Sequence, residues 1–227
     1  MTDIADRWRT IRARVDAACA AAGRPTDSVT IIAVSKTHPA AAVRAAAAAG
    51  AIDFGENYAQ ELALKRPDCP PELRWHFIGR LQRNKAKLVA GQVALVHAVD
   101  SLELARELAK RADGRLQPIL ISVNVAGEAT KGGVEPEAVT DLARDLALVQ
   151  GIRLDGLMTM PPPSEDPEAS RPAFDALRGL RDRVAQALGQ PLPVLSMGMS
   201  DDFEVAIACG ATHVRIGTAI FGEREAP

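Results

Sequence analysis

VTIIAVSK, residues 29–36, is an apolar run of strand length that ends in a lysine. A run almost continuous in Val and Ile is typical of a parallel strand buried on both faces, because a half-exposed strand would alternate apolar and polar residues. Comparable runs recur along the chain, and each is followed by a helix-like segment or by the chain end. They occupy residues 51–55, 74–79, 93–99, 117–124, 152–158, 192–197 and 212–217.

Helical periodicity fills the segments between these runs, since apolar residues recur there at three- and four-residue steps. Asp100, with Glu103 three residues on, resembles a capping box at the start of one helix. Ser200 stands where the N-cap of a helix over 201–209 would lie. Further stripes are Val139, Leu142, Leu146 and Val149 after Pro136, Phe174 to Leu188 within 168–189, and Ile4, Trp8, Ile11 and Val15 near the start.

Eight strand–helix alternations without a glycine-rich nucleotide fingerprint favour a closed barrel over an open doubly wound sheet. The predicted fold is α/β, a single (β/α)8 TIM barrel that covers residues 1–227 as one domain. We expect the N-terminal helix to take the place of the eighth helix, because little sequence follows the last strand. An open Rossmann-like sheet is the alternative, since periodicity does not show closure. The Pro-rich stretch 160–172 predicts a long loop.

Composition narrows the class of protein. The net charge of −2 offers nothing that would attract nucleic acid or an anionic membrane. The N-terminus lacks the apolar core of a signal peptide, and no apolar run reaches the roughly 18 residues of a membrane span. Cys19, Cys69 and Cys209 are too far apart for a thiolate metal cluster, and we expect reduced thiols in a cytoplasmic protein without a metal site.

Polar residues collect at the predicted C-terminal ends of the strands, which is where barrels carry their functional side chains. We therefore expect residues from most of the chain to converge on one rim. They are Ser35-Lys36, Glu56-Asn57-Tyr58, Gly79-Arg80, Asn124, the run Ser196 to Ser200, and the run Arg215 to Thr218.

Lys36 has two interpretations. A lysine at a strand end usually extends into water, and that interpretation is favoured for this residue alone. At the mouth of a barrel, however, partial desolvation would lower the pKa of the amine and make it a nucleophile for aldehydes.

The loops after the seventh and eighth strands indicate an anion site, because barrels commonly bind phosphate there. Gly198 and Gly217 would let backbone amides approach an anion closely, although Asp201 and Asp202 would repel it unless they point away. Arg215 is a donor suited to a pyridine nitrogen, or else the partner of a nearby carboxylate. A lysine, a phosphate cradle and a partner for a ring nitrogen are together what a pyridoxal cofactor needs.

Several ordered stretches give the chain a recognisable pattern, and it resembles the pyridoxal phosphate homeostasis protein family, whose barrel is similar to the N-terminal domain of alanine racemase. The resemblance covers nearly the whole chain. It departs from the family pattern at SVN (122–124) and KGG (131–133), which weakens expectations for the strand-5 rim. The matching stretches are AVSKTHP (33–39), DFGENYAQE (53–61), WHFIGRLQRNK (75–85), VHAVD (96–100), GLM (156–158), LSMGMSDDFEVAI (195–207) and VRIGTAIFG (214–222).

The resemblance implies a fold type III barrel that holds pyridoxal 5′-phosphate as a Schiff base on Lys36. Asn57 would lie beside the cofactor and Arg215 would face its pyridine nitrogen, while Ser200, Gly217 and Thr218 would hold the phosphate. The family's role is cofactor binding and supply in vitamin B6 metabolism, so apo-enzymes that use the cofactor are candidate partners. For the chain itself we expect a monomer or weak dimer.

The main alternative is a pyridoxal phosphate-dependent amino-acid racemase, which needs an acid or base on each face of the substrate. Lys36 could serve one face, but the second domain that carries a tyrosine in alanine racemases is not expected here. Tyr58 is the one tyrosine of the sequence, and His76 and His97 are interpreted as structural. We therefore favour a carrier over an enzyme.

Two further hypotheses concern anions. A barrel isomerase that acts on a sugar phosphate could use Lys36 without any pyridoxal cofactor. The basic run 79–87, with Arg80, Arg83, Lys85 and Lys87, could contact an anionic ligand or partner, although such runs are more often a solvated helix face.

Overall fold

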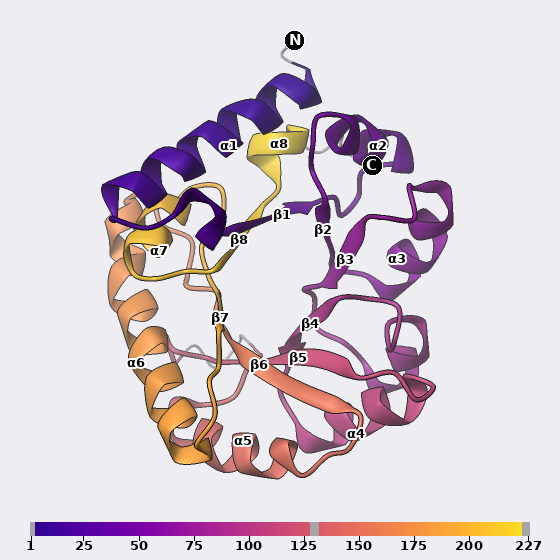
Figure 1. Ribbon diagram of the computed structural model, residues 1–227, viewed down its shortest axis with the longest axis vertical. Coiled ribbons are helices and arrows are strands. Elements are labelled where there is room, and N and C mark those ends of the chain that lie inside the picture. Colours follow the sequence, from indigo (N-terminus) through magenta and orange to yellow (C-terminus); the bar gives the residue numbers. More distant parts are fainter. Residues whose placement is uncertain (1–2, 128–131, 224–227) are drawn as a thin grey trace.

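The computed structural model describes residues 3–127 and 132–223. Its strands form one closed parallel barrel in chain order, and the first strand pairs with the last, which removes the open-sheet alternative. Helices surround the barrel on its outer side (Figure 1). The strands are β1 Thr30–Val34, β2 Asp53–Glu56, β3 Arg74–Phe77, β4 Leu95–Val99, β5 Gln117–Ser122, β6 Ile152–Met158, β7 Val194–Ser196 and β8 His213–Ile216.

All eight predicted strands are present, but most are shorter than their apolar runs. The strand β6 has the predicted bounds, whereas β2 begins two residues later than predicted, at Asp53. The α-helices are α1 Ile4–Ala21, α2 Ala40–Ala48, α3 Ala59–Lys65, α4 Leu102–Arg111, α5 Val139–Ala147, α6 Arg171–Leu188, α7 Phe203–Ala208 and α8 Thr218–Phe221. The 3-10 turns are η1 Thr26–Ser28, η2 Arg66–Asp68, η3 Arg83–Leu88, η4 Pro136–Ala138 and η5 Pro167–Ser170.

Two predicted helix starts are wrong by one or two residues. The helix α4 is preceded by Ser101 as its N-cap, not by Asp100, and no side chain caps it. The helix α7 begins after Asp202, so Ser200 is not its N-cap. Ser200 lies instead in the turn before α7, because the Asp202 carboxylate accepts the hydrogen bond of the Met199 amide and closes that turn.

The N-terminal helix α1 was predicted to take the place of a missing eighth helix, but the chain also forms the short helix α8, Thr218–Phe221. The helix α1 packs against α2, α7 and the short α8 (Figure 1). Trp8, Ile11 and Val15 on its inner face are buried. Towards α7, Arg14 lies over the ring of Phe203, with its guanidinium carbon 4.7 Å from the ring centroid. The predicted helix is therefore present and packs against α7 and α2, but the eighth helix is shortened and not missing.

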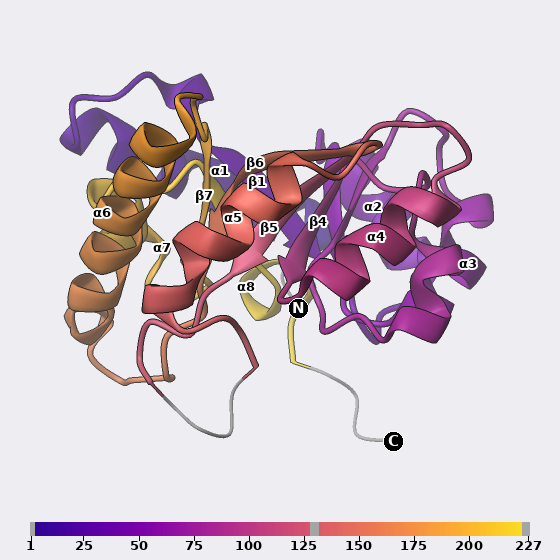
Figure 2. The same cartoon turned by 90° about the horizontal axis from the view of Figure 1, so that it is seen from below.

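The core is divided by the barrel wall. A large apolar cluster fills the space between strands and helices, while a small one inside the barrel consists of Leu95, Ala98, Leu120, Met158 and Val194. Much of the remaining interior is polar. Figure 2 shows the barrel from the side, with α8 just beyond the strands. In the described part of the chain, no helix combines the length and apolar character of a membrane span.

Candidate functional site

A cavity of about 470 Å³ opens at the C-terminal mouth of the barrel. Its size falls within the range of small-molecule and cofactor sites, roughly 300–1,000 Å³. The six residues predicted from the sequence all line it, namely Lys36, Asn57, Ser200, Arg215, Gly217 and Thr218. The structure thus brings together side chains from both ends of the sequence.

The pleat of β1 and β8 explains why Lys36 and Arg215 both enter the cavity. Successive side chains of a strand point to opposite faces, so residues two apart share a face. Ile31 and Ala33 belong to the outer core, while Val34 and Lys36 line the cavity. The strands β1 and β8 are neighbours, and Ile32 pairs with Arg215 in their register.

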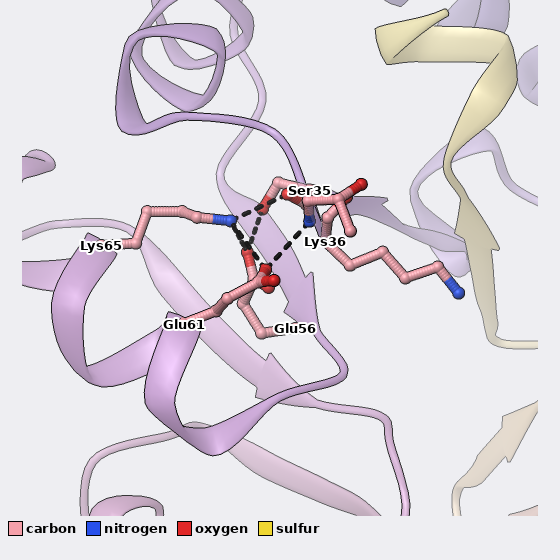
Figure 3. A network of polar contacts seen from close by, with 6 residues as sticks. Ser35, Lys36, Glu56, Glu61 and Lys65 are labelled. Carbon is pink, nitrogen blue, oxygen red and sulfur yellow. Dashed lines mark hydrogen bonds and ion pairs between the residues drawn. The ribbon is translucent and has the colours of Figure 1, made fainter. Parts of the chain in front are cut away.

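A buried polar cluster holds the backbone on either side of Lys36 (Figure 3). The ammonium of Lys65 in α3 donates to the carbonyl oxygen of Ser35 at 2.8 Å and to Oε1 of Glu56 at 2.5 Å. The hydroxyl of Ser35 donates to the same Glu56 oxygen at 2.6 Å. On the other side, the amide of Thr37 donates to Oε2 of Glu61 at 2.9 Å. The Lys36 side chain extends away from this cluster, as Figure 3 shows.

The cluster fixes a turn that a residue with a β-carbon rarely adopts. Thr37 has a φ of 66°, in the left-handed region where a β-branched side chain is strained. Such a conformation persists only when surrounding contacts determine it, and here the bond to Glu61 does so. Glu56 is fully buried, and burial raises the pKa of its carboxyl although Lys65 and Ser35 act in the opposite direction.

Asn57 is held against the cavity by a close backbone approach. A β-carbon added to Gly79 would lie 2.1 Å from the Asn57 carbonyl oxygen, so only glycine fits there. The side-chain Oδ1 of Asn57 is buried and has no hydrogen-bond partner within the described ranges. An acceptor left unmatched in a cavity wall is a place where a ligand donor or water binds.

The loops after β7 and β8 form the other side of the cavity. The hydrogen bonds of α8 begin with the amide of Ile220, so the amides of Thr218 and Ala219 precede them and have no partner within the helix. Gly198, with a φ of 91°, bends the loop after β7 so that its backbone packs on α7, and a β-carbon there would lie 2.6 Å from Ala206. The amides of Thr218 and Ala219 are therefore two donors that the helix itself does not use.

The side chains of Asp201 and Asp202, in the loop after β7, point in different directions. Asp202 is buried, and its carboxylate accepts from the Met199 amide at 2.7 Å and from the Ser170 hydroxyl at 2.8 Å. It therefore points away from the cavity. Asp201 is exposed and lines the cavity, so the repulsion expected from the sequence remains for this residue alone of the two.

Arg215 is 5 % exposed and lies in the floor of the cavity. Its Nη1 donates to the hydroxyl of Ser196 at 2.7 Å, and its Nη2 donates to the carbonyl oxygen of Thr159 at 2.9 Å. Both partners are uncharged, so the alternative of a direct carboxylate partner does not hold for these contacts. Burial lowers the pKa of Arg215 to about 10, and the nearby Asp202 acts in the opposite direction.

Part of the predicted rim does not line this cavity. Glu56 turns outward to Lys65, Asn124 bonds to Glu135, and Ser196 lies beneath Arg215 inside the barrel. Tyr58 is 56 % exposed and lines a neighbouring, larger cavity of about 830 Å³ instead. The pleat explains the difference for Glu56, because it faces away from the barrel axis while the next residue faces the cavity.

The basic run 79–87 borders both cavities. Arg80, Arg83 and Lys85 line the larger one, and Arg80 lines both. The segment forms the 3-10 turn η3, where a helix face was expected. Of the KGG stretch, Lys131 lies outside the described residues, whereas Gly132 and Gly133 line the smaller cavity.

Sequence reasoning missed several cavity residues. Asp100 was interpreted as a helix cap, although its place directly after an apolar run was the same signal that identified Lys36. Ser122, Met158 and Met160 also line the cavity at or beyond strand ends. Lys65 carried no such signal, because it lies within a helix and only the fold brings it to Ser35.

The family model described as "Alanine racemase, N-terminal domain" matches residues 7–225. A "Pyridoxal phosphate homeostasis protein" from Aquifex aeolicus is 46% identical over 223 residues, covering 97% of this chain and 98% of the relative. One of the same name from Pseudomonas aeruginosa is 46% identical over 228 residues, covering 99% of this chain and 97% of the relative.

Solved structures agree with these relationships. PipY of Synechococcus elongatus with PLP bound has a TM-score of 0.84 at 36% identity, covering 96% of this chain and 100% of that chain. An alanine racemase from Corynebacterium glutamicum shares the barrel, with a TM-score of 0.71 at 19% identity over 95% of this chain and 61% of its own. The chain therefore belongs to the alanine racemase N-terminal domain family and, within it, to the pyridoxal phosphate homeostasis proteins.

Proposed function

We propose that this protein binds pyridoxal 5′-phosphate covalently through Lys36 and serves in the homeostasis and supply of that cofactor. The observation that carries the proposal is the cavity lined jointly by Lys36, Arg215 and the loops after β7 and β8. Relatives that match this chain over almost their whole length are named pyridoxal phosphate homeostasis proteins, and the related PipY has been solved with PLP bound.

The residues present fit the cofactor. The unmatched Oδ1 of Asn57 offers an acceptor to a ligand, and the amides of Thr218 and Ala219 offer donors to a phosphate. Ser200 adds a hydroxyl to the same side. Pyridoxal phosphate supplies, when bound, an aldehyde that reacts with an amine and a pyridine ring that withdraws electrons.

Arg215 is suited to the ring nitrogen and sets the chemistry that the site favours. A guanidinium donates hydrogen bonds and accepts none, so it would hold a pyridine nitrogen in its unprotonated form. An unprotonated ring withdraws electrons more weakly, which disfavours reactions through a fully developed substrate carbanion. This property suits binding and release of the cofactor better than turnover of amino acids.

The racemase alternative is less well supported. Two-base racemisation needs a second acid or base opposite the lysine. Among the described residues that line the cavity there is no tyrosine or histidine; Asp100 and Asp201 are its carboxylates. His76 and His97 are bonded within the barrel, and Tyr58 lines the neighbouring cavity.

The first experiment tests attachment. Wild-type protein and Lys36→Ala are mixed with pyridoxal phosphate, reduced with borohydride and digested, and the peptide containing residue 36 is weighed by mass spectrometry. Before reduction, wild type should show a visible absorption band, and after reduction and digestion a phosphopyridoxyl group on Lys36; the variant should show neither. A colourless wild-type protein would favour the sugar phosphate isomerase hypothesis instead.

The second experiment separates carrier from racemase. Loaded protein is added to an apo-aminotransferase, and recovery of aminotransferase activity is compared with that from an equal amount of free cofactor. The carrier role predicts Lys36-dependent reactivation. The same preparation is incubated with L-alanine, and a sustained Lys36-dependent loss of optical rotation would overturn the carrier role in favour of a racemase.

Location and partners follow as further parts of the proposal. Three free cysteines, all buried, are compatible with a reducing compartment, and we expect the protein to act in the cytoplasm. We expect apo-enzymes that use pyridoxal phosphate as its partners, and a monomer or weak dimer in solution. Analytical ultracentrifugation of the loaded and unloaded protein tests the last expectation.

A further inference from the structure

A chain of buried polar side chains crosses the interior of the barrel beneath the cavity. It begins at Arg215, whose Nη1 lies 2.7 Å from the hydroxyl oxygen of Ser196. That oxygen lies 2.8 Å from Nδ1 of His97, and Nε2 of His97 lies 3.0 Å from Nδ1 of His76. The chain ends where Nε2 of His76 lies 2.9 Å from Oδ1 of Asp53. Five strands, β2, β3, β4, β7 and β8, thus contribute one residue each.

When both histidines are neutral, the carboxylate of Asp53 at one end fixes the direction of every hydrogen bond in the chain. Arg215 can only donate, and ionised Asp53 can only accept. The hydroxyl of Ser196 accepts from Arg215 and is left to donate to Nδ1 of His97. His97 then carries its proton on Nε2 and donates to Nδ1 of His76, which in turn carries its proton on Nε2 and donates to Asp53. Every contact has one donor and one acceptor when both histidines are neutral.

The surroundings favour a neutral His97 and an ionised Asp53. Burial holds the pKa of His97 well below its ordinary value, and His76, His213 and Arg215 act in the same direction. Asp53 accepts a second bond, at 2.5 Å from Nη2 of Arg74, which keeps its carboxylate charged. The charged groups that face the histidines are therefore Arg215 at one end, with Asp53 and Arg74 at the other, and His213 lies beside both rings.

The chain reaches a second opening of the barrel. A cavity of about 180 Å³ lies at the N-terminal mouth and is lined by Asp53, Arg74, His76 and His213, among others. Solvent therefore has access to the acceptor end of the chain, while the donor end lies in the floor of the cofactor cavity. No group of three metal-binding side chains is present in the described ranges, so a metal site does not explain the histidines.

We propose that Ser196, His97, His76 and Asp53 are positioning residues that fix the orientation of the Arg215 guanidinium at the cofactor cavity. This inference rests on the proposed function. It adds that hydrogen bonds across the barrel interior hold a residue of the proposed cofactor site in place. The bonds to Ser196 and Thr159 occupy two donors on the inner side of the guanidinium. They leave its other N–H groups for a ligand in the cavity that Arg215 lines.

The test begins with protein free of cofactor. Long-range proton–nitrogen NMR spectra of ¹⁵N-labelled protein at neutral pH report the tautomer of each histidine ring and the protected N–H signals of Arg215. We expect His76 and His97 to be neutral with the proton on Nε2. Ser196→Ala removes the link between Arg215 and His97. The Nδ1 atom of His97 then loses its donor, so its ¹⁵N shift should change, and the protected Arg215 signals should be lost.

Ser170→Ala is the matched control. It also removes a buried hydroxyl that donates to a side chain, at 2.8 Å from Asp202, but it lies outside the chain. Because the two variants lose the same kind of bond, a general loss of stability would affect both spectra alike. The proposal expects the histidine and Arg215 signals to change in Ser196→Ala and to stay unchanged in Ser170→Ala.

Titration with pyridoxal phosphate gives the second measurement. Ser196→Ala should still attach the cofactor to Lys36 but bind it roughly 10-fold more weakly, the effect of losing one charge-assisted hydrogen bond. A proton on Nδ1 of His97 or His76 in wild type, or wild-type spectra and affinity in Ser196→Ala, would overturn the proposal. If the cofactor binds neither protein, the proposed function fails, and the spectra of the free protein still decide whether the chain orients Arg215.

Discussion

The Nζ atom of Lys65 lies 2.8 Å from the carbonyl oxygen of Ser35, the residue before Lys36. A lysine in the helix α3 thus holds the end of the strand β1, at the point where Lys36 enters the cavity. The two residues are 30 positions apart in the sequence, and the hydrogen bond between them is buried. It connects the outer layer of the barrel to the position of Lys36.

Lys65→Met should therefore destabilise the protein strongly. It leaves the Glu56 carboxylate buried without its cation, and breaking a buried pair in this way costs about 3–5 kcal/mol. Urea unfolding of the cofactor-free protein measures the loss. Adding Glu56→Gln removes the isolated charge, so the double variant should be more stable than the sum of the single changes implies. Strict additivity, or an equal loss in the exposed Lys87→Met, would contradict this account.

Alanine substitutions at Gly79 and at Gly179 should have opposite effects on stability. A β-carbon at Gly79 would meet the Asn57 backbone at 2.1 Å, so Gly79→Ala should cost about 1–3 kcal/mol and weaken cofactor binding as Asn57 moves. Gly179 lies in the helix α6, where the nearest atom is the flexible end of Arg183 at 3.5 Å. Gly179→Ala should therefore stabilise the protein by about 0.5–1 kcal/mol. Thermal unfolding and cofactor titration distinguish the two, and equal effects would contradict the close approach at Gly79.

The barrel and the rim that contains the six cavity residues could be predicted from one local signal in the sequence, whereas the choice of those six residues within the rim came from the family resemblance. An apolar run that ends in a polar residue marks the end of a buried strand, and parallel strands bring such ends together. The closure of the sheet required the family resemblance or the structure, because periodicity is the same in an open sheet. The pairing of Ile32 with Arg215 is the direct demonstration of closure.

The supports of the site could not be predicted, since they depend on contacts between distant residues. His76 and His97 were correctly interpreted as structural, but their partners Asp53 and Ser196 follow only from the three-dimensional arrangement. Glu56 was placed on the rim because the sequence gives strand ends to within a residue or two. A shift of one residue moves a side chain from the cavity to the outer face.

The pH dependence of stability provides a third prediction. Burial lowers the pKa of His213 from 6.5 to about 3, with His76 acting in the same direction. Between pH 6.5 and about 3, His213 binds a proton in the unfolded chain but stays neutral in the folded protein. Stability is thus complete above pH 6.5 and falls as the pH drops towards 3, by at most about 1.4 kcal/mol per pH unit for this group.

His213→Gln should make the fall between pH 6.5 and 5 shallower, measured as urea midpoints at each pH. The slope does not vanish, because the lowered pKa of His97 contributes with the same sign. Glu56 has a raised pKa and acts with the opposite sign, but it is present in both proteins and cancels in the comparison. Identical slopes would show that His213 is protonated as readily in the folded protein as in the unfolded chain.

Asp201 and Asp202 give a fourth prediction, because these two adjacent aspartates point in different directions in the loop after β7. Asp202 holds the loop through the Met199 amide and Ser170, so Asp202→Ala should cost about 1–3 kcal/mol in unfolding free energy and weaken cofactor binding. Asp201 is exposed and lines the cavity. Its charge opposes a phosphate, so Asp201→Asn should leave stability within about 0.5 kcal/mol of wild type and tighten binding a few-fold.

Salt separates this electrostatic effect from a change in shape. Repulsion between exposed charges is screened within a Debye length of about 10 Å at 0.1 M salt, so the gain in Asp201→Asn should shrink as salt is added. The loss in Asp202→Ala should persist, because a buried carboxylate that bonds to a backbone amide acts by holding the loop in place. Pyridoxal phosphate titrations at low and high ionic strength measure both. If the two variants respond to salt alike, the phosphate does not lie at this loop, and the anion site must be sought beside Arg80 and Arg83 at the larger cavity.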